Sequence, residues 1–229
     1  MIKTNNKINV IRSFTRREGR LTLGQRIACE TLWQHYGIDE KNGIIDFDQI
    51  FNRHAATLLE IGFGNGDTLL AMAKAQPQWN FIGIEVYRPG LGALLANLKK
   101  QQLTNVRVFH ADALDVLKNN IPNQSLSAVH LFFPDPWPKR PHHKRRLVQK
   151  EFCLLVAEKL QKEGYFHIAT DWEDYAVHMQ KVIAALPIFQ IVPAIQARPL
   201  TKFEKRGRNL GHEVYDFVLK KLGLSQIIG

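Results

Sequence analysis

The chain has 229 residues, a length that suits one domain, or one domain with a terminal extension, whose core needs neither disulfides nor a structural metal. Its two cysteines, Cys29 and Cys153, match no zinc-binding or redox spacing, and no apolar run approaches a membrane span, so a disulfide scaffold, a zinc module and a membrane protein are not expected. The net charge is +10 and unevenly placed, because three segments hold seventeen of the thirty-one Lys and Arg but two of the twenty-one acidic residues.

These basic segments are Met1–Arg26, Lys139–Arg146 and Arg198–Arg208. Basic patches on a mildly acidic body predict a polyanionic partner with a defined footprint, although solvated surface charge is the alternative for each patch. Residues 1–25 are expected to form a basic N-terminal arm that orders only on RNA. A transit peptide is the alternative for this arm, and a reducing cytoplasm is the expected compartment.

The predicted elements begin with a helix at Gly24–Tyr36, and from Thr57 onward short apolar strands alternate with amphipathic helical stretches. This alternation is typical of a parallel sheet covered by helices on both faces. The expected strands are Thr57–Gly62, Asn80–Val86, Val106–His110, Ala128–Phe133, Tyr165–Thr170, Phe189–Val192 and His212–Lys220. The expected helices are Thr68–Ala75, Gly90–Gln101, Arg146–Lys162 and Trp172–Leu186. No helix separates the last two strands, which predicts an antiparallel pair that closes the sheet.

Acidic and glycine residues follow the first three strands, where ligands of open α/β sheets bind. Gly62, Gly64 and Gly66 come directly after strand one, and glycines allow backbone amides to approach a ligand closely, although a tight turn that binds nothing is the alternative. Glu85 ends strand two, where an acidic side chain can accept from both hydroxyls of a ribose. Asp112 follows strand three, where a carboxylate can accept from an adenine amino group.

The glycine spacing favours S-adenosylmethionine over a nicotinamide dinucleotide. The third glycine comes one residue early for the G-x-G-x-x-G pattern, and Asp67 occupies the dinucleotide position. An acid beside the loop, Glu60, would repel a pyrophosphate but suits the cationic amino acid end of S-adenosylmethionine. A surface contact is the alternative for Glu60.

The segment after strand four is rich in proline and then in cations. Four prolines in eight positions predict a stiff extended loop that carries Asp135 to the carboxyl end of the sheet, where a methyl acceptor should lie. Trp137 is expected either to stack on a base or to pack within the protein. The run Lys144–Arg146 is expected to contact phosphates or to be solvated, and the pair His142–His143 lacks a third ligand for a metal.

This proline-rich run, Phe133–Lys139, with the His-Lys-Arg-Arg sequence that follows it, resembles the bacterial tRNA (guanine-N7-)-methyltransferase family. The resemblance extends from about Arg16 to Lys220 and includes four further segments: Leu59–Gly66, Gly83–Gly90, Ala169–Glu173 and Arg198–Gly207. It implies a Rossmann-like class I methyltransferase fold, α/β with a seven-stranded, mostly parallel sheet, one antiparallel strand and helices on both faces, over residues 26–229. It also implies S-adenosyl-L-methionine as cofactor and methyl transfer to N7 of a guanine in the variable loop (position 46) of tRNA, with no metal, no membrane and no obligate protein partner.

The resemblance assigns roles residue by residue. The positions that would hold the cofactor are Glu60, Gly62, Gly64, Gly66, Glu85, Asp112 and Asp135, and Asp135 is also the catalytic position. The substrate-binding positions are Lys139, Asp171, Thr201, Lys202, Phe203 and Glu204. The RNA-contacting positions are Pro141, His142, His143, Lys144, Arg145 and Arg146. Pro141 is a departure, because relatives have arginine there, whereas here Arg140 stands one position earlier.

Guanine N7 carries an in-plane lone pair, so methyl transfer to it needs alignment and electrostatics rather than a base. Asp135 is expected to orient the guanine and to stabilise its developing positive charge. Asp171 is expected to accept from the Watson–Crick edge of the base, to cap the next helix, or both. Two other functions stay open from the residues alone: a non-catalytic RNA-binding module on a methyltransferase scaffold, and a nicotinamide-dependent oxidoreductase.

Overall fold

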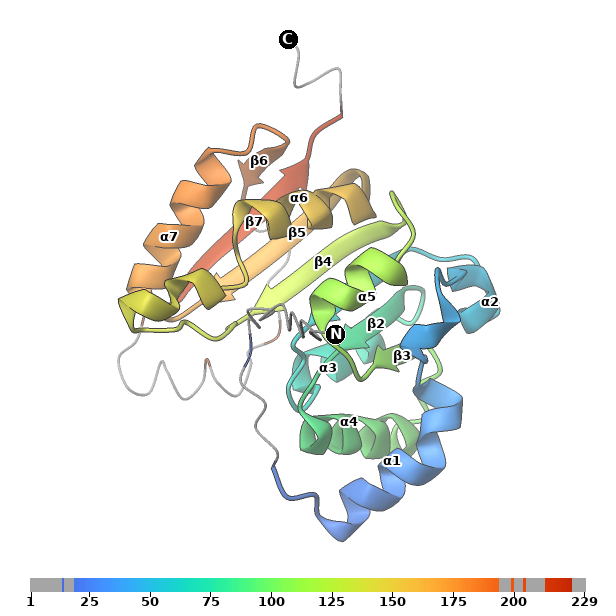
Figure 1. Cartoon of the computed structure of the whole chain (residues 1–229). Helices are drawn as coiled ribbons and strands as arrows, with labels where there is room; N and C mark the ends of the chain where they lie inside the picture. Colours follow the sequence, from blue (N-terminus) through green and yellow to red (C-terminus); the bar gives the residue numbers. More distant parts are fainter. Residues whose placement is uncertain (1–13, 15–18, 194–198, 200–203, 205–212, 224–229) are drawn as a thin grey trace, which may run out of the picture.

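A seven-stranded sheet forms the centre of the described chain in the computed structural model, which describes residues 14, 19–193, 199, 204 and 213–223 (Figure 1). The strands are β1 Thr57–Ile61, β2 Asn80–Ile84, β3 Val106–Phe109, β4 Leu126–Phe132, β5 Leu160–Thr170, β6 Phe189–Val192 and β7 Tyr215–Lys221. Their order in the sheet is β3-β2-β1-β4-β5-β7-β6, and β7 runs antiparallel to both of its neighbours while the other pairs are parallel. The predicted class of fold, with one antiparallel strand, is therefore confirmed.

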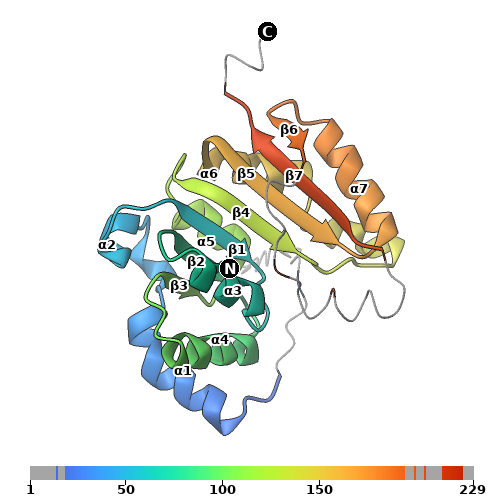
Figure 2. The same cartoon turned by 180° about the vertical axis from the view of Figure 1, so that it is seen from behind.

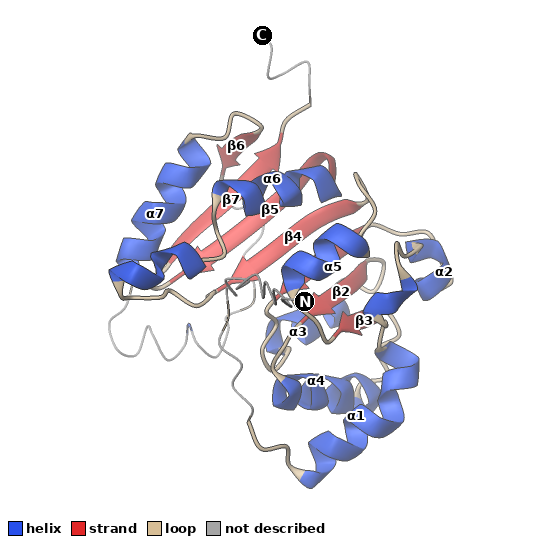
Figure 3. Cartoon of the chain, viewed as in Figure 1, coloured by secondary structure: helices blue, strands red, loops and turns tan. Residues whose placement is uncertain are grey.

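Helices pack on both faces of this sheet (Figures 1 and 3). One face carries α1 Leu23–Tyr36, α3 Asp67–Ala75 and α4 Arg88–Lys100, and Figure 2 shows α3 and α4 on the near side. The other face carries α2 Phe47–Phe51, α5 Ala113–Asn119, α6 Lys150–Lys159 and α7 Glu173–Ala184. Two 3-10 helices, η1 Glu40–Asn42 and η2 Arg140–Arg145, lie in the connections.

The sheet has a hydrophobic core on each face, because successive side chains of a strand point to alternate faces. Leu58 and Phe81 face α3 and α4, whereas their neighbours Leu59 and Ile82 face α5 and α6, and all four are at most 5% exposed. Successive side chains of a strand point to opposite faces, so a sheet buried on both sides needs apolar residues at nearly every position. Glu60 is a buried charged-type residue in the same strand, and it lies near the end of the strand next to the glycine loop.

The expected helix Arg146–Lys162 is wrong at both ends. The chain forms η2 up to Arg145, enters α6 at Lys150, and is already in β5 at Leu160, where it pairs with Leu126 of β4. Helices α2 and α5 are absent from the expected elements because five and seven residues are too short for a 3.6-residue pattern to be recognised. Strand pairing sets where α6 ends, and the N-caps Asp46 and Asp112 set where α2 and α5 begin. The hydrophobic periodicity of the sequence does not determine these bounds.

At the N-terminus, α1 begins at Leu23, inside the segment assigned to the basic arm, and a capping box of Thr22 and Gln25 starts it. Residues 1–13 and 15–18 of that arm lie outside the described residues. Among the helices that the structure describes, none is long and apolar enough to cross a membrane.

Candidate functional site

The candidate site lies at the carboxyl ends of the parallel strands, where the direction of the strand order reverses. From β1 the chain proceeds to β2 and β3 on one side, and β4, the other neighbour of β1, leads on to β5. The glycine loop after β1 and the Asp135 loop after β4 therefore leave adjacent strands at the same edge. This is the switch point at which ligands bind in open α/β sheets.

The glycine loop uses backbone conformations that side chains disfavour. The φ angles of Gly62, Gly64 and Gly66 are +73°, +57° and +79°. A Cβ on Gly66 would lie 2.6 Å from the side chain of Leu94, so this glycine is required for packing of α3 against α4. A Cβ on Gly62 or Gly64 would meet no atom within 4 Å among the described residues, so the two glycines face open space beside the sheet edge. The loop Gly62–Gly66, called the glycine cradle below, therefore leaves room for a ligand beside its backbone.

Glu85 fastens that cradle to the end of β2. Its Oε2 accepts the backbone N–H of Gly64 at 2.7 Å, and its Oε1 accepts those of Val86 at 2.7 Å and Tyr87 at 2.9 Å. Burial raises the pKa of this carboxyl, while the hydrogen bonds from the three backbone N–H groups oppose the rise. Since a carboxylate oxygen can accept two hydrogen bonds, Oε2 keeps capacity for a ligand hydroxyl.

Glu60 is buried in β1 with 3% of its surface exposed, so the surface alternative for this residue is wrong. Its Oε2 is buried and has no hydrogen-bond partner among the described residues. Burial, and then the nearby Glu85 carboxyl, raise the pKa of Glu60 to about 8. A buried carboxyl oxygen without a hydrogen-bond partner is costly, and a cationic ligand group would offset that cost.

Asp112 has a structural role that the sequence reading does not include. Its Oδ1 accepts the N–H of Leu114 at 2.9 Å and so caps the start of α5. Capping α5 uses only part of the acceptor capacity of the carboxylate. Asp112 can therefore also accept a hydrogen bond from a ligand at the end of β3.

Gly90, in the first turn of α4, is a site residue that the assigned roles omit. A Cβ at this position would lie 2.1 Å from the carbonyl oxygen of Gly64. We expect Gly90→Ala to displace the glycine loop and to raise the Kd for S-adenosylhomocysteine by about tenfold or more, the effect of a loss of ~1.4 kcal/mol. Calorimetric titration measures this, and Gly24→Ala in α1, where a Cβ meets nothing within 4 Å, is the matched control. Equal affinities of the two variants would show that the contact does not shape the cofactor site.

The loop after β4 is sharply bent rather than extended. Phe133 and Trp137 have φ angles of +53° and +45°, which non-glycine residues adopt at a cost of about 1 kcal/mol or more each. Between them Asp135 is exposed at the sheet edge. The predicted extended conformation of the loop is therefore wrong at Phe133 and Trp137, which lie on either side of Pro134 and Pro136. Contacts elsewhere in the loop must hold this conformation.

Trp137 packs within the protein, which is one of its two predicted roles. The guanidinium of Arg145 lies 3.8 Å from the centre of its ring, and His142 meets the ring edge-on at 5.8 Å between centroids. One face of the indole is therefore covered by a cation of η2.

The RNA-contacting stretch folds as η2, and most of its side chains are accessible. Lys139 precedes η2, and Arg140, Pro141, His142 and Lys144 are exposed, as is Lys139 itself. Arg146 differs, because it is 2% exposed and pairs with Asp174 of α7. The hydrogen bond from Arg146 lowers the pKa of Asp174. The prediction that Arg146 contacts RNA is therefore corrected, because its guanidinium is directed into the protein.

Asp171 follows β5 and lines a groove of about 520 Å³ with its neighbours, and the lining residues are Asp171, Trp172, Glu173, Asp174, Glu213 and Tyr215. Trp172 occupies the N-cap position of α7, and its side chain makes no capping hydrogen bond; the capping alternative for Asp171, one residue earlier, stays a prediction. Acceptors predominate in this groove, which suits a base edge rich in N–H donors.

The remaining substrate positions come from the C-terminal part of the chain. Thr201, Lys202 and Phe203 lie outside the described residues, and Glu204 is described and 1% exposed. Within the described ranges, no group of three or more His, Cys, Asp or Glu side chains has a metal-binding arrangement.

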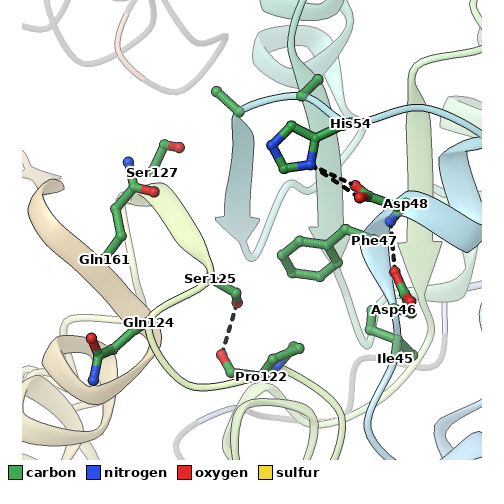
Figure 4. Close-up of a pocket in the computed structure, with 12 residues that line it drawn as sticks. Ile45, Asp46, Phe47, Asp48, His54, Pro122, Gln124, Ser125, Ser127 and Gln161 are labelled. Carbon is green, nitrogen blue, oxygen red and sulfur yellow. Dashed lines mark hydrogen bonds and ion pairs between the residues drawn. The ribbon is translucent and has the colours of Figure 1, made fainter.

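A second cavity, of about 680 Å³, lies at the opposite edge of the sheet (Figure 4). Ala56 precedes β1 in its wall, Ser125 and Ser127 stand at the start of β4, and His54 is paired with Asp48. These are the amino ends of the strands, and the residues lining this cavity include none of the assigned site residues.

Comparison with known proteins agrees with this geometry. A family model described as "Putative methyltransferase" matches residues 54–217. A tRNA (guanine-N(7)-)-methyltransferase of Hydrogenovibrio crunogenus is 51% identical over 93% of this chain and 91% of its own length. The chain belongs to the tRNA (guanine-N(7)-)-methyltransferase family. A member from Shewanella amazonensis is 50% identical over 93% of this chain and 92% of its own.

Solved structures of more distant proteins share the fold. The 16S rRNA methyltransferase KamB superposes with a TM-score of 0.59 at 15% identity, over 79% of this chain and 95% of its own. An S-adenosylmethionine-dependent O-methyltransferase from Thermotoga maritima gives 0.51 at 15% identity, over 79% and 67%. At such identities the likeness establishes the class I methyltransferase fold and nothing further.

Proposed function

We propose that this chain transfers the methyl group of S-adenosylmethionine to N7 of a guanine in the variable loop of tRNA. The observation that carries the proposal is the meeting of two halves at the β1–β4 switch point in a member of this family. One half is the glycine cradle with Glu60 and Glu85, and the other is Asp135 with Asp171. The enzyme is a methyltransferase, S-adenosylmethionine is its cofactor, and tRNA is its partner.

The residues present fit S-adenosylmethionine. The open space beside Gly62 and Gly64 has room for the cofactor. Oε2 of Glu60, which has no hydrogen-bond partner among the described residues, suits the ammonium group of the cofactor. Glu85 has acceptor capacity for the ribose, and Asp112 stands where an adenine amino group would come. When bound, the cofactor supplies a methyl group on a positively charged sulfur.

Asp135 is the proposed catalytic residue. It is exposed at the switch point, between the two left-handed residues Phe133 and Trp137. We assign it the orientation of guanine and the stabilisation of the positive charge that develops on the purine as N7 is methylated. Asp171 would accept from the Watson–Crick N–H groups of the same base, since it lies after the next strand of the sheet, β5.

The RNA backbone would lie on the other side of Asp135. Lys139, Arg140 and Lys144 present exposed cations before and along η2, which suits phosphates. Thr201–Glu204 are retained as substrate-binding residues from the family pattern. The non-catalytic alternative is not favoured, because a binding module has no use for a buried acid with a raised pKa beside a glycine cradle.

The pH dependence of stability tests the cofactor half of the site. The pKa of Glu60 is raised to about 8 from 4.5, so between these pH values the native state binds more protons than the unfolded state. We therefore expect the free energy of unfolding of the cofactor-free protein to fall as pH rises through this window, by at most about 1.4 kcal/mol per pH unit. Glu60→Gln should make this fall clearly shallower, measured by urea unfolding at several pH values, while the raised pKa of Glu85 accounts for the part that remains. Exposed Glu30→Gln is the control, and an unchanged slope in Glu60→Gln would refute the assignment.

Methyl transfer itself is tested with labelled S-adenosylmethionine and an unmodified tRNA transcript. The control transcript carries 7-deazaguanine at the variable-loop position and therefore lacks the N7 lone pair. We expect label in the first transcript and none in the second. Equal labelling of both would move the target to another nucleotide, and no labelling of either, with cofactor binding intact, would return the binding-module function.

A further inference from the structure

Arg146 differs from the other cations of its segment in where its charge lies. Its side chain is 1% exposed, whereas the neighbouring cations Lys139, Arg140 and Lys144 are exposed. A buried guanidinium requires partners for its N–H groups. The structure provides them from two different site segments.

The first partner is the loop that bears Asp135. Arg146 Nε–H donates to the carbonyl oxygen of Pro136 at 2.9 Å. Pro136 directly follows Asp135 and lies between the two left-handed residues of the loop, Phe133 and Trp137. The hydrogen bond therefore holds the Pro136–Trp137 peptide, one residue beyond the proposed catalytic Asp135.

The second partner is the start of α7. Arg146 Nη2 pairs with the carboxylate of Asp174, three residues after Asp171, and the guanidinium lies over the ring of Tyr175 at 4.9 Å. The hydroxyl of Tyr175 in turn accepts the N–H of Val148 at 3.0 Å. The planar guanidinium of arginine can donate to the Pro136 carbonyl and to the Asp174 carboxylate at the same time, whereas the compact ammonium of lysine cannot.

We propose that Arg146 is a positioning residue that sets the loop of Asp135 relative to that of Asp171, and so aligns the two carboxylates on the base. The inference rests on the proposed function for the identity of the base. It assigns no contact with RNA to Arg146.

The test compares Arg146→Lys with Arg107→Lys, a matched control outside the proposed site whose half-buried guanidinium also donates to backbone carbonyls and lies over an aromatic ring, that of Phe51. For Arg146→Lys we expect kcat at saturating tRNA to fall about tenfold or more, with the Kd for S-adenosylhomocysteine within twofold of the wild type. The slope of log tRNA affinity against log salt should stay unchanged, because no phosphate contact is lost. A phosphate contact predicts the reverse: kcat retained, KM for tRNA raised, and a slope shallower by about one. That result would overturn the proposal.

A second measurement does not depend on the methylated product. Hydrogen exchange of the backbone amides in residues 133–139 should speed up in Arg146→Lys and in Asp174→Asn, while exchange in β1 stays slow. The double variant should lower kcat by less than the product of the two separate effects, since both changes act on one interaction. Unchanged exchange in residues 133–139 would overturn the positioning role even if the acceptor proved to be another nucleotide.

Discussion

Asp135→Asn should lower kcat by about 100-fold or more while the Kd for S-adenosylhomocysteine changes by less than about threefold. Asparagine keeps the size and much of the hydrogen bonding of the side chain but removes the negative charge that opposes the charge developing on guanine. Because Asp135 is exposed and belongs to no helix or strand, the variant should fold normally. Single-turnover methylation of a tRNA transcript measures the chemical step apart from product release.

The control for this change is Asp115→Asn, an exposed carboxylate on α5 that has no part in the proposed site. It should leave kcat and the affinity for tRNA unchanged. A kcat of Asp135→Asn within threefold of the wild type would remove Asp135 from the catalytic role and leave Asp171 as the remaining candidate.

Glu85→Gln should weaken S-adenosylhomocysteine binding by about 100-fold or more. The carboxylate accepts three backbone N–H groups and is proposed to accept from the ribose, and hydrogen bonds to a charged group contribute about 1.5–3 kcal/mol each. An amide NH2 in place of Oε2 would face the N–H of Gly64 and leave that donor unpaired. The glycine cradle would then open.

A truncated ligand separates this effect from that of Glu60. 5′-Methylthioadenosine keeps the ribose and adenine but has no amino acid end. We expect Glu85→Gln to weaken both ligands, and Glu60→Gln to weaken S-adenosylhomocysteine alone, in calorimetric titrations at one pH. If Glu85→Gln spared methylthioadenosine, the ribose assignment would be wrong.

The position of the site could be predicted from the sequence because parallel strands place their carboxyl ends at one edge. Glu60, Glu85, Asp135 and Asp171 stand at or just after separate predicted strands, and the observed strand order puts those strands side by side. Glycine spacing and charge then indicated the class of cofactor. This part depended on local patterns and one general rule of topology.

The inward direction of Arg146 could not be predicted in the same way. In the sequence it is the last of three consecutive cations, and its partner Asp174 lies 28 residues further on. Which of the three faces the interior depends on the turn of a 3-10 helix that begins around a proline, and on packing against Tyr175. The apolar Leu147–Val148 pair that follows was the available signal, because it marks where the chain enters the core.

The burial of Glu60 at the end of β1 couples the stability of this enzyme to the presence of its cofactor. Glu60 Oε2 is buried without a hydrogen-bond partner in the part of the chain that the structure describes, and a ligand that binds the native state alone stabilises that state by RT ln(1 + [L]/Kd). At a concentration of one hundred times Kd that is about 2.7 kcal/mol, enough to change the unfolded fraction by roughly 100-fold. We therefore expect the unfolded fraction of the purified enzyme to rise as the concentration of its cofactor falls toward Kd.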